Sequence, residues 1–434
     1  MNPLRSLTLS TSLSVNMHGV QLSTTSPFVY ALFGIQLPNN NNDDATTTSE
    51  KTTLITQFDN LLCTHPAHTD HIVQDNTTSL PTREGESQCG KTRIWLTYWT
   101  TSQDYQAWWL SPSVQQFWSN LPDDAGVWRE VMTLPASRTQ HGTNCPEVAG
   151  MGHLGPRNSV ADKSGYWGCY RQRLTATTVE KDPLNSTFPL GKDQEKERRC
   201  PYSGSNETST SNSTGTEAAE DRSHSKGIVI PDEKVPSKTH PGRVLITNIP
   251  DNICFVVEGQ DHTTLTPSER DLWFKCYDSL TTQWFKDLLL STNSNTATLF
   301  SDTGPINTRF CYDPSSEKYR HETTIPSLNY NRKIQLFYFR DLEALERIGR
   351  QNLGHVKLRK TFLGAYGPGG EMFGVGNLGL WVETSVVKNG EMECEQNDYG
   401  HNSFLHCHPS LGAIWAHWKP QFKLLTSWIH LPPE

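Results

Sequence analysis

A polar segment, residues 175–241, limits most strongly how this chain of 434 residues can fold. The segment is rich in Ser, Thr, Asn, Lys and Glu, has few large apolar residues, and is nearly of low complexity from Ser203 to Thr216. Such a composition cannot bury enough apolar surface to offset the conformational entropy lost on ordering. We therefore expect a disordered surface insertion that joins two halves of one fold, residues 27–174 and 242–434, behind a flexible N-terminus of residues 1–26.

The two halves share a predicted order of elements, a strand, a helix and two further strands. Apolar and aromatic runs predict strands at Phe28–Gln36, Arg93–Trp99, Val127–Met132, Tyr166–Arg173, Arg243–Thr247, Pro250–Asp261, Asn307–Cys311, Gln335–Phe339 and Leu378–Val387. Apolar periodicity predicts helices at Leu54–Cys63, Asp104–Trp118, Ser268–Leu290 and Leu342–Arg347. This order indicates an α+β fold of two tandem ferredoxin-like units, of the dimeric α/β-barrel type, with helices packed on antiparallel sheets.

Composition excludes several classes of function. The formal net charge of -8 gives no reason to expect nucleic acid or acidic membranes as partners. The 10 cysteines form no CxxC pair, so we expect free thiols and neither a zinc ribbon nor a thioredoxin-type site. No apolar run reaches the roughly 18 residues of a membrane span.

The segment from Leu336 to Val387 is the candidate for the functional centre. It reads as a strand, then a helix that Asp341 caps, then a lone histidine, His355, in a basic and apolar setting, and then a second strand. A neutral imidazole can bind iron through one ring nitrogen. The chain has 16 histidines, however, and most histidines in proteins are hydrogen-bonded or exposed, so spacing alone does not assign His355 to a metal.

Several motifs resemble those of the aldoxime dehydratases, haem enzymes that convert aldoximes to nitriles. The residues that carry the resemblance are Leu345-Glu346-Arg347, His355, Phe362, Val382-Glu383, Cys407-His408-Pro409, the run Tyr166–Arg173, and Pro250-x-Asn252-x-Cys254 with Gly259-Gln260-Asp261. The resemblance covers nearly the whole chain apart from its insertions, and its motifs are specific in combination.

The resemblance implies a cofactor and roles for individual residues. It makes His355 the axial ligand of the iron of haem b, with Phe362 beside the cofactor. Arg171 and Arg173 point to one face of an extended strand and suit haem propionates or an oxygen-bearing substrate; a pair of solvated surface charges is the alternative. The resemblance also implies an aldoxime-like substrate, a homodimer and a cytoplasmic location.

The chain departs from the family's pattern at the groups that handle protons. The family's distal histidine falls on Val382, its serine on Glu258, and its upstream glutamate on Gln140. Hydroxide is a poor leaving group, so dehydration of an aldoxime needs a placed acid. Val382 can neither donate nor accept a proton, and the acid must therefore be elsewhere if the reaction takes place.

Three functions remain open at this stage. In the first, the chain is a haem lyase in which the Glu258 carboxyl, its pKa raised by an apolar pocket, replaces the histidine, with His262 as a weaker substitute. In the second, the chain binds haem without dehydrating aldoximes, and senses a ligand or acts on another N–O bond. In the third, the haem is lost and the fold serves association.

Overall fold

The computed structural model describes residues 17–37, 45–63, 65–75, 91–122, 125–145, 147–160, 171, 174–176, 243–247, 249–293, 305–321, 323 and 325–397. These residues belong to one unit, made of Met1–Phe188 and Pro241–Glu434. Within them, all strands join one sheet in the order β7-β1-β6-β12-β9-β11-β10-β3-β4-β2-β5-β13-β8. The predicted mixture of helices and antiparallel strands is confirmed.

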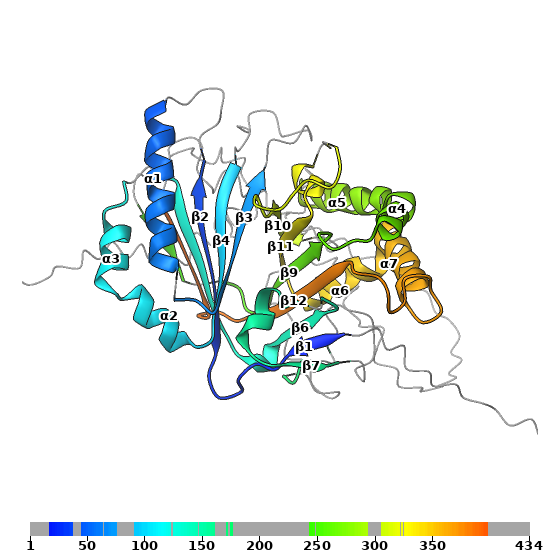
Figure 1. Ribbon diagram of the computed structural model, residues 1–434. Helices are drawn as coiled ribbons and strands as arrows, with labels where there is room; N and C mark the ends of the chain where they lie inside the picture. The colour runs from blue at the N-terminus through cyan, green and yellow to red at the C-terminus, as the bar shows by residue number, and fades with distance from the viewer. Residues whose placement is uncertain are drawn as a thin grey trace, which may run out of the picture. The chain divides into compact units, whose positions relative to one another are not determined.

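The first half places helices between its strands in a β-α-β-β-α-β order. Its four central strands lie in the sheet as β3-β4-β2-β5, and every neighbouring pair is antiparallel. The elements are β2 (Phe28–Gln36), α1 (Ala45–Leu62), β3 (His68–Asp75), β4 (Lys91–Trp99), α2 (Ser102–Trp109), α3 (Pro112–Ser119) and β5 (Val127–Leu134). Helices α1, α2 and α3 cover one face of these strands (Figure 1).

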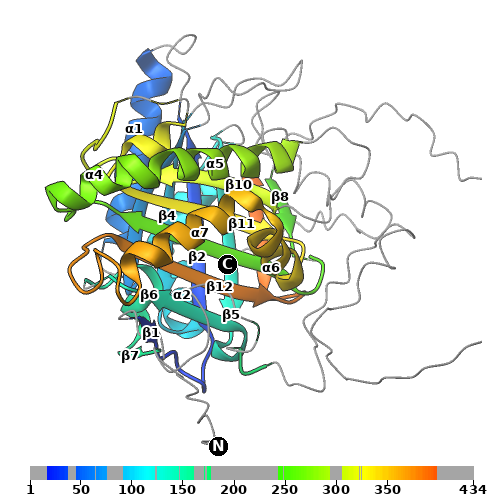
Figure 2. The same cartoon turned by 90° about the vertical axis from the view of Figure 1, so that its right-hand side faces the viewer.

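The second half repeats this order with two consecutive helices in each helical position. Its four central strands lie as β12-β9-β11-β10, again all antiparallel. The elements are β9 (Ile253–Asp261), α4 (Pro267–Cys276), α5 (Asp278–Asn293), β10 (Pro305–Tyr312), β11 (Arg332–Phe339), α6 (Leu342–Gln351), α7 (Leu353–Tyr366) and β12 (Gly379–Val387). Figures 1 and 2 agree that α4, α5, α6 and α7 lie over one face of this part of the sheet.

The halves are joined by direct strand pairing and by an exchange of edge strands. β3 pairs with β10, so the central strands of both halves form one series. A first-half strand, β6 (Thr139–Thr143), adds to the edge of β12, and a second-half strand, β13 (Met392–Asn397), adds to the edge of β5. The outer strands are β1 (His18–Val20) and β7 (Arg157–Ser159) at one end and β8 (Arg243–Ile246) at the other.

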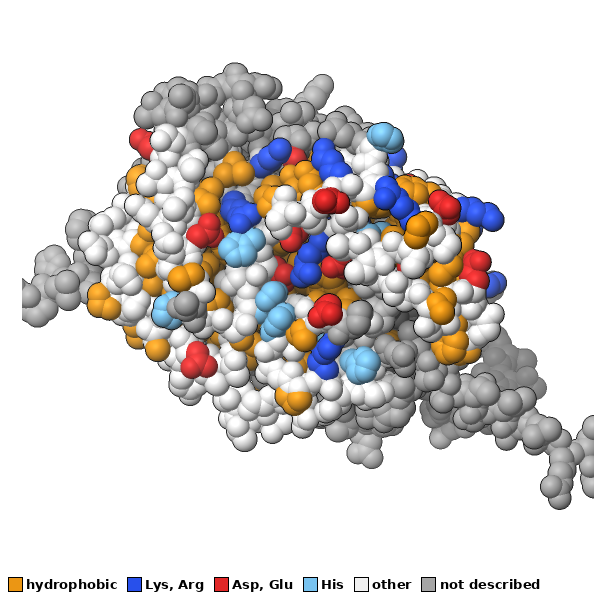
Figure 3. All heavy atoms as spheres, viewed as in Figure 1, with side chains coloured by type: hydrophobic (Ala, Val, Ile, Leu, Met, Phe, Trp, Pro, Cys, Tyr) orange, Lys and Arg blue, Asp and Glu red, His pale blue; other side chains and the backbone are white. Residues whose placement is uncertain are grey.

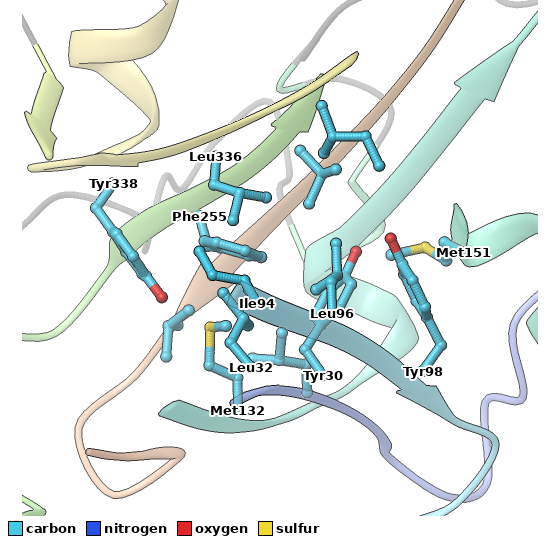
Figure 4. Packing of buried hydrophobic residues seen from close by; sticks show 14 of the residues in the cluster. Tyr30, Leu32, Ile94, Leu96, Tyr98, Met132, Met151, Phe255, Leu336 and Tyr338 are labelled. Atoms are coloured by element: carbon cyan, nitrogen blue, oxygen red, sulfur yellow. The ribbon is translucent and has the colours of Figure 1, made fainter. Parts of the chain in front are cut away.

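Side-chain alternation along the strands separates an inner core from two helix-covered cores. The inner core takes residues from both halves, among them Tyr30, Leu96, Phe255, Leu336 and Tyr338 (Figure 4). The alternate residues face the helices, so that Val256, Phe337 and Val382 pack with α4–α7 in a separate cluster. A residue's position in its strand therefore tells which core its side chain enters.

The inner core also holds a buried ion pair between the halves. The Arg309 guanidinium of β10 donates to both carboxylate oxygens of Glu130 on β5, at 2.9 and 2.5 Å, and the Tyr338 hydroxyl donates to the same carboxylate at 2.8 Å. A buried pair offsets its desolvation only when its remaining polar atoms find partners, which the tyrosine supplies here. The pair links a strand of the first half to two strands of the second across the inner core.

Several boundaries differ from the sequence-based predictions. Helix α1 begins at Ala45 and not at Leu54, and the expected helix Ser268–Leu290 is two helices, with Thr266 as the N-cap of α4. The described fold begins before residue 27, because His18–Val20 forms β1 and pairs with β6 and β7. The polar segment, except for residues 175 and 176, and the motif Cys407-His408-Pro409 lie outside the described residues. Among the described helices, none is both long and apolar enough to cross a membrane.

Candidate functional site

His355 lies in the first turn of α7, a helix that the sequence reading did not anticipate. The Asn352 side chain caps this helix by accepting a hydrogen bond from the His355 backbone N–H at 2.8 Å. The Asn352 amide also donates to Asp287 of α5 at 3.0 Å. The cap therefore fixes both where α7 begins and how its first turn sits against α5.

The hydrogen bonding of the His355 ring assigns its tautomer. Its Nδ1 lies 3.0 Å from the Gly349 carbonyl oxygen, which can only accept a hydrogen bond, so Nδ1 carries the proton. The other nitrogen, Nε2, then keeps its lone pair. Metal-binding histidines usually have this arrangement, because a carbonyl behind the ring fixes its orientation and raises its basicity.

The surroundings of His355 favour the neutral ring. Burial lowers the pKa of the imidazole, and the Arg359 guanidinium lowers it further. The ring lies 4.6 Å from that of Trp284 on α5, centroid to centroid. Phe362 follows two turns later on α7, is buried, and stacks on Tyr366 with ring centroids 4.3 Å apart. A half-buried, neutral imidazole beside aromatic side chains can bind iron without first losing a proton.

Replacing Asn352 by Ala should weaken haem binding more than it weakens the fold. The loss of a side-chain cap costs about 1 kcal/mol of stability, and here it also releases the turn that holds the His355 ring. We expect a higher Kd in a haem titration followed at the Soret band, with a modest fall in melting temperature.

Thr266→Ala is the matched control for this prediction, because it removes the equivalent cap of α4, where the Thr266 side chain accepts from the Glu269 N–H. The control should lose similar stability and keep its haem affinity. Equal haem affinity in both variants would show that the cap does not position the ligand.

On the sheet, Val382 and Glu258 are direct neighbours. Val382 of β12 pairs in register with Glu258 of β9, which pairs in turn with Gln335 of β11. Side chains at paired positions project from the same face of a sheet. Val382 belongs to the helix-covered cluster, so all three side chains are on the face that α4–α7 cover. Val382, the position at which the resemblance places the family's distal histidine, thus lies one strand away from a carboxyl group.

The environment of Glu258 suits an acid. The side chain is half-buried, yet the protein around it excludes enough water to raise the pKa of the carboxyl from 4.5 to about 7. Among the described residues, burial is the sole cause of this shift. A carboxyl with this pKa is substantially protonated at neutral pH, and it can donate a proton and take it back.

His262, the weaker substitute for the acid, is in an unsuitable environment. Its ring lies between Trp273 and Tyr319, with centroids 4.4 and 4.6 Å away. Burial and the charges of Lys333 and Arg320 hold the pKa of the imidazole well below its ordinary value. A histidine that remains neutral has no proton to give as a cation, so Glu258 is the better candidate for the acid.

The remaining predicted site residues are only partly placed. Gln140 of β6 pairs with Thr384 of β12, two residues from Val382 and therefore on the same face. Arg171 lies in a helical turn and not in a strand; its backbone N–H donates to Glu346 of α6 at 3.3 Å, and its Nε lies 3.5 Å from the same carboxylate. The prediction of an extended strand is thus wrong at Arg171. Arg173 lies outside the described residues.

Glu383, next to Val382, belongs to a different environment. It projects into the inner core, where its carboxylate accepts hydrogen bonds from the Tyr30 hydroxyl at 2.8 Å and the Met151 N–H at 2.7 Å (Figure 4 shows both residues). Burial raises the pKa of this carboxyl to about 8. Its hydrogen bonds are already used within the protein, so it is a structural carboxyl of the inner core.

One buried amide on the sheet indicates, independently of His355, that a bound molecule could meet the helix-covered face. Gln335, opposite Glu258, is 1% exposed, and neither polar atom of its amide has a hydrogen-bond partner among the described residues. Polar atoms buried in this way usually meet a ligand or water. Sequence reasoning missed Gln335 and the Asn352 cap. Two signals were available in the sequence. The alternation of side chains along β11 places Gln335 on a covered face. An Asn three residues before His355 suits a helix N-cap.

The described part of one face of the molecule shows how its charged side chains are distributed. On the described part of the face in Figure 3, acidic and basic side chains are interspersed rather than gathered by sign. Among the described residues, no group of three or more potential ligands could hold a metal ion in the manner of a zinc or calcium site.

Comparisons with known proteins identify the family and the fold. A family model described as haem-containing dehydratase matches residues 31–399. No curated protein matches the sequence. Among solved structures, an aldoxime dehydratase in complex with butyraldoxime has a TM-score of 0.60 and 16% identity, covering 92% of this chain and 89% of that one. A second aldoxime dehydratase has a TM-score of 0.58 and 16% identity, covering 92% and 93%. The fold is thus a mixture of helices and antiparallel sheet similar to that of aldoxime dehydratase, and the chain belongs to the haem-containing dehydratase family.

Proposed function

We propose that this protein is a haem b-dependent carbon–nitrogen lyase that dehydrates an aldoxime to a nitrile, with Glu258 in place of the family's distal histidine. The single observation that carries the proposal is the register of β12 and β9, which pairs Val382 with Glu258. Paired Cβ atoms in antiparallel strands are about 5 Å apart. The loss of an acid at one position is therefore matched by a carboxyl at the adjacent position on the same face.

The cofactor would be held by residues of α7 and by the arginine beside α6. His355 would supply a nitrogen ligand to the iron, Phe362 would supply an apolar contact, and Arg171 would supply a cation for a propionate, with Arg173 as its expected companion. When bound, ferrous haem supplies an iron that binds the aldoxime nitrogen. The carbonyl behind His355 would keep its ring in one orientation as the ligand changes.

Glu258 would handle both protons of the reaction. Its protonated carboxyl gives a proton to the aldoxime oxygen, the N–O bond breaks, and water leaves with that electron pair. The carboxylate then takes the proton from the aldoxime carbon, and the C–H electron pair becomes the third C–N bond. An aldoxime becomes a nitrile and water, and Glu258 returns to its protonated form. Gln140, on the same face, remains a predicted member of this site.

A second function is favoured by Val382 itself. Only 9% of the surface of this apolar side chain is exposed. An apolar side chain at this position suits a haem protein that does not dehydrate aldoximes. Such a protein would bind a gas or a bulky ligand, or act on another N–O bond. The tandem ferredoxin-like interpretation rests on the repeated β-α-β-β-α-β order. A homodimer and a cytoplasmic location remain predictions from the resemblance.

Reconstitution and product analysis separate these functions. The protein is purified with added haem, reduced with dithionite, and given aliphatic and aryl aldoximes, with nitrile measured by chromatography. Haem uptake with nitrile formation supports the lyase. Haem uptake without nitrile from any aldoxime contradicts the lyase and supports the ligand-binding function. Failure to take up haem contradicts both and supports a role in association.

A further inference from the structure

Gln335 has an unusual combination of position, burial and hydrogen bonding. Its neighbours Leu336 and Tyr338 enter the inner core, whereas Phe337 and Phe339 enter the helix-covered core. Alternation along β11 therefore puts Gln335 on the helix-covered face. There it pairs with Glu258 on one side and with Phe310 of β10 on the other.

The buried Gln335 amide lacks hydrogen-bond partners among the described residues. Only 1% of the residue is exposed, and neither Oε1 nor Nε2 has a partner among the described residues. A buried polar atom without a partner destabilises the fold, while an apolar side chain of similar shape at the same position does not. A glutamine here thus costs stability unless a group other than the described residues bonds to it.

A second polar group without a partner lies on the helix opposite. The Thr281 hydroxyl of α5 belongs to a residue that is 2% exposed, and it has no hydrogen-bond partner among the described residues. Thr281 is one turn before Phe285, whose ring stacks on that of Phe310 with centroids 4.3 Å apart. The hydroxyl therefore lies on the side of α5 that covers the strand next to Gln335.

We propose that Gln335 is a substrate-binding residue whose amide holds the hydroxyl group of an N–O ligand beside Glu258, with Thr281 as a further contact. This rests on the proposed function, which supplies the N–OH group. Oε1 accepts the hydrogen bond of the aldoxime hydroxyl, and Nε2 donates to its oxygen. With its hydrogen directed to Gln335, the oxygen presents a lone pair to Glu258. The residue thus selects for a free N–OH and against an O-alkylated analogue.

The test compares two ligands on haem-loaded wild-type protein and on Gln335→Met, which removes both polar atoms and keeps most of the volume. Affinities for an aldoxime and for its O-methyl ether are measured by calorimetry. Wild type should prefer the free hydroxyl by about tenfold, the value of one or two net hydrogen bonds. Gln335→Met should lose that preference, and its ligand-free form should melt at a higher temperature, by roughly 2–4 °C.

Two further variants keep the test decisive. Gln103→Met, an exposed substitution on α2, should change neither quantity. Thr281→Val removes the second hydroxyl and should also reduce the preference, which covers the case in which Gln335→Met fails to fold. If Gln335→Met keeps the full preference for the free hydroxyl, the amide serves the fold or a bound water and the inference is overturned.

The outcomes also separate this inference from the proposed function. Loss of the preference in a protein that forms no nitrile would support Gln335 as a ligand-binding residue and contradict the lyase. Nitrile formation with an unchanged preference would support the lyase and overturn the role of Gln335.

Discussion

Replacing His355 by Ala is expected to abolish the Soret band of protein purified with added haem. The Gly349 carbonyl holds the proton on Nδ1, so Nε2 is the nitrogen available to iron. The other described residues proposed to contact the haem are Phe362 and Arg171. They would make apolar and ionic contacts and would not bind the iron. The haem-to-protein ratio, from absorbance and a pyridine haemochrome assay, should fall from near one to near zero.

Controls separate ligation from folding in this variant. His71→Ala changes a partly exposed histidine of β3 in the other half and should keep its haem. Added imidazole should restore a Soret band to His355→Ala, because a free ligand can fill the space of the missing ring. An unchanged haem content in a folded His355→Ala variant would show that another residue binds the iron.

Replacing Glu258 by Gln is expected to lower the rate of nitrile formation by about 10²–10⁴-fold, the usual contribution of a placed acid–base group. Haem content should not change, because Glu258 is on the sheet and the proposed axial ligand is on α7. Glu50→Gln, an exposed carboxyl of α1, is the matched control and should keep full activity. Full activity in haem-loaded Glu258→Gln would remove this residue from the mechanism.

The pH dependence of kcat/KM gives a second test of Glu258 as the acid. Burial raises the pKa of the Glu258 carboxyl to about 7. The protonated form is the acid, so kcat/KM should fall as pH rises through about 7, and this limb should be absent from Glu258→Gln. The same pKa shift sets the direction in which the free energy of unfolding changes with pH. The folded state holds a proton that the unfolded state has released, so stability relative to Glu258→Gln should decline from about pH 4.5 through pH 7 and then level off.

Local patterns predicted the mixture of helices and strands and the start of the helix after β11. Asp341 was expected to cap the helix after β11, and it does so by accepting from the Ala344 N–H at 2.8 Å. Such caps and strand periods are local, so they can be read from neighbouring residues. Helix α7 was not predicted, although Leu358, Phe362 and Ala365 share a helical period and Asn352 is a suitable N-cap.

The distal arrangement could not be read from sequence. Glu258 and Val382 are far apart in the chain, and only strand register makes them neighbours. The same holds for Gln335, whose burial depends on helices from other parts of the chain. Arg171 also depends on a distant contact, because its partner Glu346 belongs to α6. Pairings between remote strands and helices depend on the whole fold and leave no local signal.

The most direct measurement of the central claim is the rate of nitrile formation by the haem-loaded double variant Glu258→Gln/Val382→His. The two positions are cross-strand partners on one face, so an acid at residue 382 should reach the substrate oxygen that Glu258 is proposed to protonate. We expect the histidine to recover at least about tenfold of the rate lost in Glu258→Gln, as a restored acid–base group should. A double variant that holds haem and binds aldoxime yet remains as slow as Glu258→Gln would contradict the exchange of acids between these two strands.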